Sequence, residues 1–264
     1  MQKEYEEIIG KRVTSLKWLR QELLQMDYLA KPIMGIKDWD DACCVNFGNK
    51  KLVASVDGPY KKRLVMKSAL IHAATDVLVK GAKPLFALDT VSGSENDVRE
   101  MIKSLKIQAL AMKIPILGGN TMIEEGTEPK CSLTVVGELL VKEPIRDNGA
   151  KENDSLILIG EPIWGEQNER IQKAKIMFAT WYEILHAKIK LHAAKDVTKG
   201  GLVSTLYEIS TKSKKKFILE DNIPFSMTRN LDNFLVAVSK KDCEKIEKIC
   251  KKHKCGFCRI GKVK

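Results

Sequence analysis

A chain of 264 residues with 44% hydrophobic and 30% charged residues has the composition of a folded globular protein, not of a disordered or fibrous one. It contains no apolar run of about 18 residues, so the sequence predicts no membrane-spanning helix. The formal net charge of +11 comes mostly from lysine. Because the lysine runs lack interleaved aromatic residues, this charge favours a solvated surface over a nucleic-acid interface.

The start of the chain and its cysteines indicate where the protein resides. The first residues, Met-Gln-Lys-Glu-Tyr-Glu-Glu, carry acids where a secretion signal has a basic head and an apolar core. Seven cysteines in such a chain are expected to be thiols and not disulfides. We therefore expect a cytoplasmic protein.

The first part of the chain is expected to contain helices and strands in alternation. Apolar residues at helical spacing over residues 4–27 predict one helix, or two helices broken near Gly10. After a loop, alternating and β-branched patterns predict strands at 43–47, 52–56, 85–88, 114–117 and 132–141 and helices at 64–80 and 96–112. Gly81 and Pro84 are expected to end the helix at 64–80.

A polar stretch rich in Pro, Gly and Asn at 144–153 predicts a boundary between two domains. Beyond it the sequence predicts strands at 155–159, 231–238 and 257–263 and helices at 169–190, 200–212 and 241–252. We therefore expect an N-terminal helical segment at 1–30, a first domain at 31–145 and a shorter second domain at 146–264. Alternating strands and helices in both domains predict a mixed α/β (α+β) fold.

Three aspartates stand in separate, recognisable contexts. Asp41 lies in Asp-Asp-Ala-Cys-Cys-Val, Asp57 in Ser-Val-Asp-Gly, and Asp76 in Ala-Thr-Asp-Val-Leu-Val-Lys-Gly. Mg²⁺ prefers oxygen ligands and is usually shared between one or two carboxylates and substrate phosphates. A Gly118-Gly119 pair at an expected strand end would let the backbone approach a phosphate. This combination predicts a magnesium–nucleotide site and a phosphoryl-transfer enzyme.

The order of these motifs resembles the N-terminal half of the aminoimidazole ribonucleotide (AIR) synthase superfamily. That group also includes thiamine-monophosphate kinase, selenophosphate synthetase and the carbamoyl dehydratase of hydrogenase maturation. In the second half, Ala194-Lys-Asp-Val-Thr-Lys-Gly-Gly-Leu202 is similar to the family's Asp-Val-Thr-x-Gly-Gly-Leu helix start, and Arg259–Val263 is similar to its closing strand. The resemblance covers residues 31–264, and several weak motifs in the right order make it specific.

The resemblance implies a two-domain AIR synthase-like fold that uses ATP and Mg²⁺ on an unknown small-molecule substrate. Asp41, Asp57 and Asp76 would hold Mg²⁺ and serve catalysis. The phosphates would be lined by Gly118, Gly119, Asn120 and Thr121, and the substrate cleft by Asp196, Thr198, Lys199 and Gly200. The N-terminal halves of two subunits would join their sheets, which implies a homodimer with the nucleotide near the interface.

Ordinary structural roles compete with several of these assignments. Asp57 precedes Gly58-Pro59 and is also typical of a turn. Asp76 shares an expected helix face with His72 one turn earlier. If this face were exposed, Asp76 could pair with a lysine instead of a metal. Asp196 or Thr198 could cap the helix that follows.

Two residues depart from the family pattern. Asn120 stands where several members have an acid, and it offers one neutral oxygen in place of a carboxylate. Trp39 stands where many members have a glycine, which removes a permissive backbone position. The first change leaves open a non-catalytic nucleotide-binding or assembly protein of the same fold.

The cysteines of the C-terminal segment give a third hypothesis. Cys243, Cys250, Cys255 and Cys258 include a Cys-x₂-Cys pair, which is a pattern found in zinc and iron–sulfur sites. Their spacing is irregular, and core positions on a helix and a strand explain all four equally well.

Overall fold

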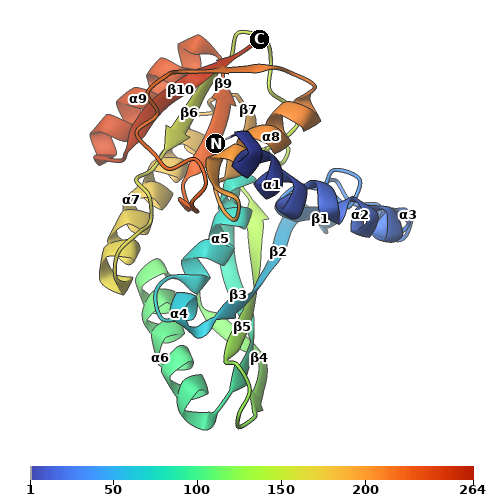
Figure 1. The fold of residues 1–264 in the computed structure, drawn as a ribbon, viewed down its shortest axis with the longest axis vertical. Helices are drawn as coiled ribbons and strands as arrows, with labels where there is room; N and C mark the ends of the chain where they lie inside the picture. The colour runs from blue at the N-terminus through green and yellow to red at the C-terminus, as the bar shows by residue number, and fades with distance from the viewer. Residues whose placement is uncertain (1) are drawn as a thin grey trace.

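The computed structural model describes residues 2–264, without the side chains of Arg12 and Leu16. Each half of this chain builds one five-stranded sheet (Figure 1). The chain passes from the first sheet to the second between Leu139 and Ser155. This arrangement confirms the expected mixed α/β fold.

The first sheet has the strand order β1-β2-β5-β3-β4. Its strands are β1 (Cys43–Phe47), β2 (Lys50–Lys61), β3 (Ala82–Gly93), β4 (Ile116–Ile123) and β5 (Lys130–Leu139). Neighbours are antiparallel except β3 and β4, which are parallel and joined through a helix. The strand expected at 132–141 corresponds to β5 at the centre of the sheet.

The second sheet has the order β7-β9-β6-β10-β8, with antiparallel pairing throughout. Its strands are β6 (Ser155–Ile159), β7 (Leu191–Asp196), β8 (Phe217–Leu219), β9 (Phe234–Val238) and β10 (Phe257–Val263). Strands β6 and β10 match the predicted ranges. Strand β7 lies between the helices expected at 169–190 and 200–212, where no strand was predicted.

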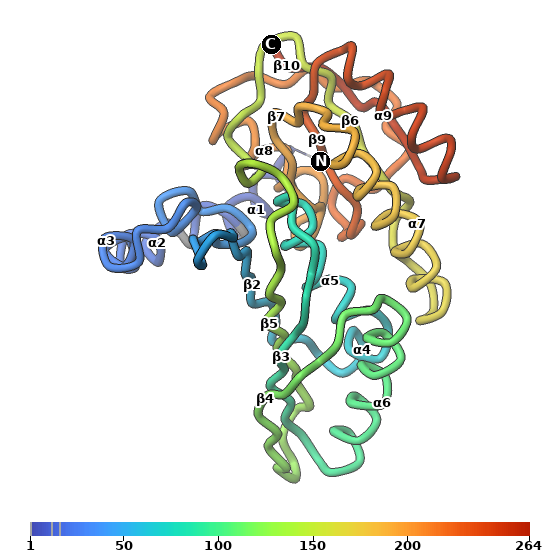
Figure 2. Tube along the Cα trace, turned by 180° about the vertical axis from the view of Figure 1, so that it is seen from behind, coloured from blue at the N-terminus to red at the C-terminus, as the bar shows by residue number. Residues whose placement is uncertain are grey.

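The helices of the first half are α1 (Gln2–Arg12), η1 (Thr14–Leu16), α2 (Lys17–Leu23), α3 (Met26–Ala30), α4 (Lys62–Val65), α5 (Ala69–Val79) and α6 (Glu95–Met112). Those of the second half are α7 (Gln167–His186), α8 (Gly201–Ser213) and α9 (Lys240–His253). The N-terminal helix breaks after Arg12 and Leu23, while Gly10 lies inside α1. Helices α2 and α3 project away from both sheets (Figures 1 and 2). In the described residues, no helix is both long and apolar enough to cross a membrane.

Helices α4, α5 and α6 cover one face of the first sheet, and the other face is open (Figure 1). Side chains of β5 alternate accordingly: Cys131, Leu133 and Val135 are buried, while the residues between them are only half-buried. The open face and its β4 edge carry large apolar side chains, with Val56 69% and Leu117 68% exposed. A surface of this kind favours contact with another protein surface.

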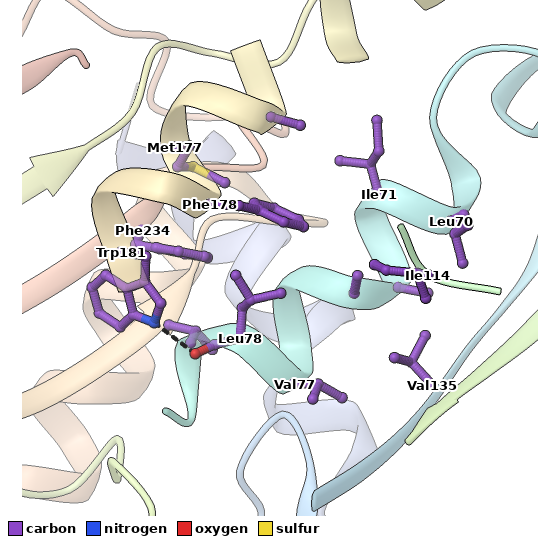
Figure 3. Close-up of a cluster of buried hydrophobic side chains, with 14 of the residues drawn as sticks. Leu70, Ile71, Val77, Leu78, Ile114, Val135, Met177, Phe178, Trp181 and Phe234 are labelled. Atoms are coloured by element: carbon purple, nitrogen blue, oxygen red, sulfur yellow. Dashed lines mark hydrogen bonds between the residues drawn. The ribbon is translucent and has the colours of Figure 1, made fainter. Parts of the chain in front are cut away.

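Helix α5 is the structural centre of the molecule, because every one of its residues is buried. Its Leu78 side chain lies close to Phe178 and Trp181 of α7, with Ile71 on the same side of the helix (Figure 3). The Trp181 indole nitrogen donates a 2.7 Å hydrogen bond to the Leu78 carbonyl oxygen. Burial of each such side chain contributes on the order of 1.5–3 kcal/mol, so this apolar contact holds the two halves of the chain together.

Two first-half elements differ from the sequence prediction for local reasons. The helix expected at 64–80 is two helices, α4 and α5, separated by a turn at 66–68. Strand β4 does not end at Gly118-Gly119 but continues to Ile123, because the glycines pair in parallel register with β3. A Cβ at Gly119 would lie 1.9 Å from the Asp89 carbonyl oxygen, so glycine is needed there for close strand pairing.

Candidate metal and nucleotide site

One face of α5 is polar although the helix is buried. His72, Asp76 and Lys80 follow one another at spacings of four residues, and Thr75 lies three residues after His72, which places all four on one side of the helix. Each of them contacts residues of the second half or of the segment before β1. Buried polar groups must find partners, so this face fixes how the two halves meet.

Three carboxylates from distant parts of the chain converge at this face. Asp41 precedes β1, Asp76 lies on α5 and Asp196 ends β7, and each offers an oxygen within 4.8 Å of the others. The hydroxyl of Ser55 donates a 2.7 Å hydrogen bond to Asp76 Oδ2, and that of Thr75 donates one of 2.7 Å to Asp196 Oδ2. We call Asp41, Asp76 and Asp196 the carboxylate cluster.

Burial and mutual repulsion disfavour the charged form of two carboxylates in the cluster. Burial, together with the neighbouring charges of Asp196 and Asp57, raises the pKa of Asp76 well above its ordinary value. Burial also raises the pKa of Asp196. An all-oxygen donor set of crowded, buried carboxylates fits a hard cation such as Mg²⁺, which would neutralise them.

Asp57 lies outside the carboxylate cluster, on β2. Its Oδ2 atom lies 3.2 Å from His72 Nε2, and its Oδ1 atom accepts a 2.7 Å hydrogen bond from the Gly58 backbone nitrogen. His72 Nδ1 in turn contacts Asp232, in the segment before β9. Burial opposes the charge of Asp57, but His72 outweighs it and lowers the pKa of Asp57. A metal-ligand role for Asp57 stays a prediction.

Buried lysines occupy the other side of the cluster. Lys80 Nζ lies 3.1 Å from Asp41 Oδ2 and also contacts Asp147, whose side chain is fully buried. Lys195 contacts Asp41 as well. Lys212 Nζ lies 3.0 Å from Asp40 and 2.9 Å from Asp147. The adjacent residues Asp40 and Asp41 thus pair with different lysines, and only Asp41 joins the carboxylate cluster.

A pocket of about 450 Å³ opens beside Asp41, between the N-terminal segment and the strands β1 and β2. Its lining includes the apolar side chains Met26, Pro32, Ile36, Trp39, Val45 and Val56. Trp39 has a left-handed backbone with φ of +53°, a conformation that glycine adopts more readily than tryptophan does. The pocket places an apolar surface next to the carboxylate cluster.

The residues expected to line the phosphates lie elsewhere within one chain. Gly118, Gly119, Asn120 and Thr121 belong to β4, at the opposite edge of the sheet from β1. Strands β2, β5 and β3 lie between the two edges. All four residues are exposed, so a phosphate role would need a second subunit to bring them to a cluster.

The Asp196–Gly200 segment divides between two environments. Asp196 is buried in the carboxylate cluster, whereas Lys199 is exposed. Gly200 is the N-cap residue of helix α8, and its φ of +91° suits a glycine. No side chain caps this end of the helix. The capping interpretation of Asp196 and Thr198 is therefore wrong. A substrate role for Thr198, Lys199 and Gly200 stays a prediction.

The C-terminal cysteines do not assemble into a metal site in this structure. Cys243, Cys250 and Cys255 are buried, and Cys258 is partly buried. Among residues 2–264, the carboxylate cluster is the one group of three or more His, Cys, Asp or Glu side chains with metal-ligand spacing. The cysteines thus serve as small core residues of α9 and β10.

Sequence reasoning missed several members of this site. Asp196 was assigned to the substrate and not to the metal, and the partners Ser55, Lys80 and Asp232 were not singled out. The helical spacing of Thr75, Asp76 and Lys80 was an available signal, because three polar residues on one face of an otherwise apolar helix require partners. No local signal marks Asp232, whose role arises from contact with His72 in the other half.

Comparison with known proteins assigns this chain to a family. The family model described as "AIR synthase related protein, N-terminal domain" matches residues 39–139, and the model described as "AIR synthase related protein, C-terminal domain" matches residues 136–264. An uncharacterized protein of Methanocaldococcus jannaschii is 38% identical over 232 residues, covering 87% of this chain and 77% of its own length.

Two further similarities concern proteins with known ligands or activities. Selenide, water dikinase of Myxococcus xanthus is 30% identical over 189 residues, covering 64% of this chain and 52% of the relative. The structure of PurL from T. maritima complexed with ADP is similar with a TM-score of 0.72 and 15% identity, over 85% of this chain. This chain spans only 42% of that PurL chain, so the likeness shows the fold.

Proposed function

Because the chain belongs to the AIR synthase-related family, we propose that it binds Mg-ATP and activates a small-molecule substrate by phosphoryl transfer. The observation that carries this proposal is the carboxylate cluster beside an apolar pocket. Relatives whose names imply ATP use, such as selenide, water dikinase, support it.

In this proposal the chain contributes position and charge, without a protein nucleophile. Asp41, Asp76 and Asp196 would hold Mg²⁺, and Asp57, which pairs with His72, would be a further catalytic carboxylate. Bound Mg²⁺ would neutralise the phosphate charge that develops during transfer. Ser55 and Thr75 orient two of the carboxylates through hydrogen bonds, and the pocket beside Asp41 takes the nucleotide.

We also propose that the protein is a cytoplasmic homodimer. The open face of the first sheet supports a dimer, because exposed apolar side chains on β2, β3 and β4 lack a partner within residues 2–264. A second copy on this face would bring its Gly118–Thr121 toward the pocket of the first. All seven cysteines are free thiols, which agrees with a reducing compartment. Light scattering should give a dimer mass at micromolar concentration, and a monomer mass would contradict the dimer.

Thermal melting tests the nucleotide proposal. Mg-ATP should raise the melting temperature, because a ligand that binds the native state stabilises it by mass action. Asp76→Asn should remove most of this gain and Asp41→Asn part of it. Asp221→Asn, at an exposed position, is the matched control and should behave as the natural protein does. If neither ATP nor ADP shifts the melt at millimolar concentration, the proposal is wrong.

A non-catalytic nucleotide-binding role is the second candidate. The observation that favours it is Asn120, a neutral amide exposed on β4 where several family members have an acid. ATP turnover separates the two candidates. Slow release of phosphate that Asp76→Asn abolishes supports the enzyme, and binding without turnover supports the alternative.

A further inference from the structure

Helix α5 ends on a lysine whose charge is shut inside the protein. Lys80 is the C-cap residue of this helix, and its side chain is fully buried. Lysine is almost never buried to this degree unless it is paired, because its ammonium group loses its water shell and must find oxygen partners within the protein. The place of this ammonium group therefore shows where the fold requires a positive charge.

The partners of the Lys80 ammonium group form the ligand set of a hard cation. Its nitrogen lies 3.1 Å from Asp41 Oδ2 and donates hydrogen bonds to Asp147 Oδ1 and, at 3.0 Å, to the Ala194 carbonyl oxygen. Carboxylate and carbonyl oxygens are the ligands that magnesium, manganese and calcium ions prefer in proteins. The three oxygens come from the segment before β1, the connection between β5 and β6, and strand β7, so the ammonium group joins separate parts of the chain.

One oxygen of Asp41 remains free to bind a second cation. Lys195 donates a hydrogen bond to Asp41 Oδ1. In contrast, Asp41 Oδ2 is buried and accepts no hydrogen bond from the residues that the structure describes, although Lys80 lies near it. A buried carboxylate oxygen without a donor costs free energy unless another positive group reaches it. Asp41 Oδ2 thus lies between the Lys80 ammonium group and the ion proposed for the carboxylate cluster.

The other two members of the carboxylate cluster have hydroxyl partners and no ion pair. Asp76 accepts a hydrogen bond from Ser55, and Asp196 accepts one from Thr75. Within residues 2–264, no lysine, arginine or histidine nitrogen lies within 4.0 Å of either carboxylate. The positive charge supplied by the chain is therefore concentrated on the Asp41 side of the cluster, and the opposite side requires an ion from solution.

We propose that Lys80 is a tethered cation that occupies a metal-ion position among Asp41, Asp147 and Ala194. It thereby limits the carboxylate cluster to one exchangeable divalent ion per chain in the absence of nucleotide. This inference rests on the proposed function, because it concerns the number of ions in the same site. Unlike a bound ion, the ammonium group cannot dissociate, so Asp41 stays in place when the exchangeable ion leaves.

The test compares two variants that lose the same charge. Lys80→Ala opens the position of the ammonium group to an ion, whereas Lys80→Met fills it with an apolar side chain. Without nucleotide, Mn²⁺ at a hundredfold excess over its dissociation constant should raise the melting temperature of Lys80→Ala by about 5–10 °C more than that of Lys80→Met. Lys83→Ala, at an exposed position on β3, is the surface control and should respond to Mn²⁺ as the natural protein does.

Electron paramagnetic resonance of free Mn²⁺ counts the bound ions and gives the second readout. The natural protein and Lys80→Met should each bind one Mn²⁺ per chain, and Lys80→Ala should bind two. Two ions in the natural protein, or the same count in both variants, would overturn the inference. Lys80→Ala that stays unfolded with Mn²⁺ would also contradict it, because the ion should replace the ammonium group. No ion in the natural protein but one in Lys80→Ala would support the role of Lys80 and contradict the metal site proposed for the carboxylate cluster.

Discussion

The two sides of helix α5 meet the second half of the chain in opposite ways. On one side Ile71 and Leu78 pack against the aromatic residues of α7, and the contact is buried and apolar. On the other side Asp76 and Lys80 meet Asp196 and Asp147, and the contact consists of buried charges. The apolar side supplies free energy of association. The charged side contributes less to stability, since buried ion pairs recover little beyond their desolvation cost, but it creates the site.

The largest expected effect tests the charged side. Lys80→Met removes the ammonium group that contacts Asp147 and Asp41 and leaves two buried carboxylates short of a partner. We expect a loss of about 3–5 kcal/mol in the free energy of unfolding, measured by urea denaturation. Lys83→Met, on an exposed position of β3, should cost little. A small effect of Lys80→Met on the free energy of unfolding would mean that water reaches the carboxylates of Asp41 and Asp147 freely.

The apolar side should respond less strongly to a conservative change. Trp181→Phe removes the hydrogen bond to the Leu78 carbonyl oxygen and part of the contact with Phe234, whose ring centroid lies 4.7 Å away. We expect a loss of about 1–3 kcal/mol in the same measurement. Trp18→Phe is the matched control, because Trp18 is 59% exposed. Equal effects at the two tryptophans would contradict the role given to this contact.

A third change should stabilise the protein when no metal is present. Asp76→Asn removes a buried carboxylate that lies beside Asp196 and Asp57, while its side-chain oxygen can still accept from Ser55. In the absence of magnesium, the melting temperature should therefore rise slightly. Magnesium and ATP together should reverse the order of the two proteins. If Asp76→Asn is less stable than the natural protein under both conditions, the carboxylates do not repel one another as we infer.

The smallest effect on stability is expected at Asn120, which is exposed on β4. Asn120→Asp should change the free energy of unfolding by less than about 0.5 kcal/mol. If the position is a weakened metal ligand, the change should tighten the dependence of ATP binding on magnesium. Isothermal titration at two magnesium concentrations measures this. Loss of ATP binding at both concentrations would exclude a metal-ligand role and favour the non-catalytic candidate.

The sequence predicted features that depend on local pattern. The strands predicted at 155–159 and 257–263 match the structure residue for residue, and the motifs around Asp41 and Asp76 indicated the family. The prediction failed at Gly118-Gly119, where a pair typical of a turn is instead required for close strand pairing. The sequence also assigned Asp196 to the substrate and not to the metal. Local pattern could not show that Asp41, Asp76 and Asp196 converge, because this depends on how the two halves pack.

Anomalous diffraction from crystals grown with Mn²⁺ and ATP tests the central claim most directly. Mn²⁺ replaces Mg²⁺ at oxygen-ligand sites and gives a position that does not depend on the protein model. We predict an anomalous peak bounded by the carboxylates of Asp41, Asp76 and Asp196, with the nucleotide in the pocket beside Asp41. ATP bound elsewhere, or a peak remote from these three aspartates, would contradict the account.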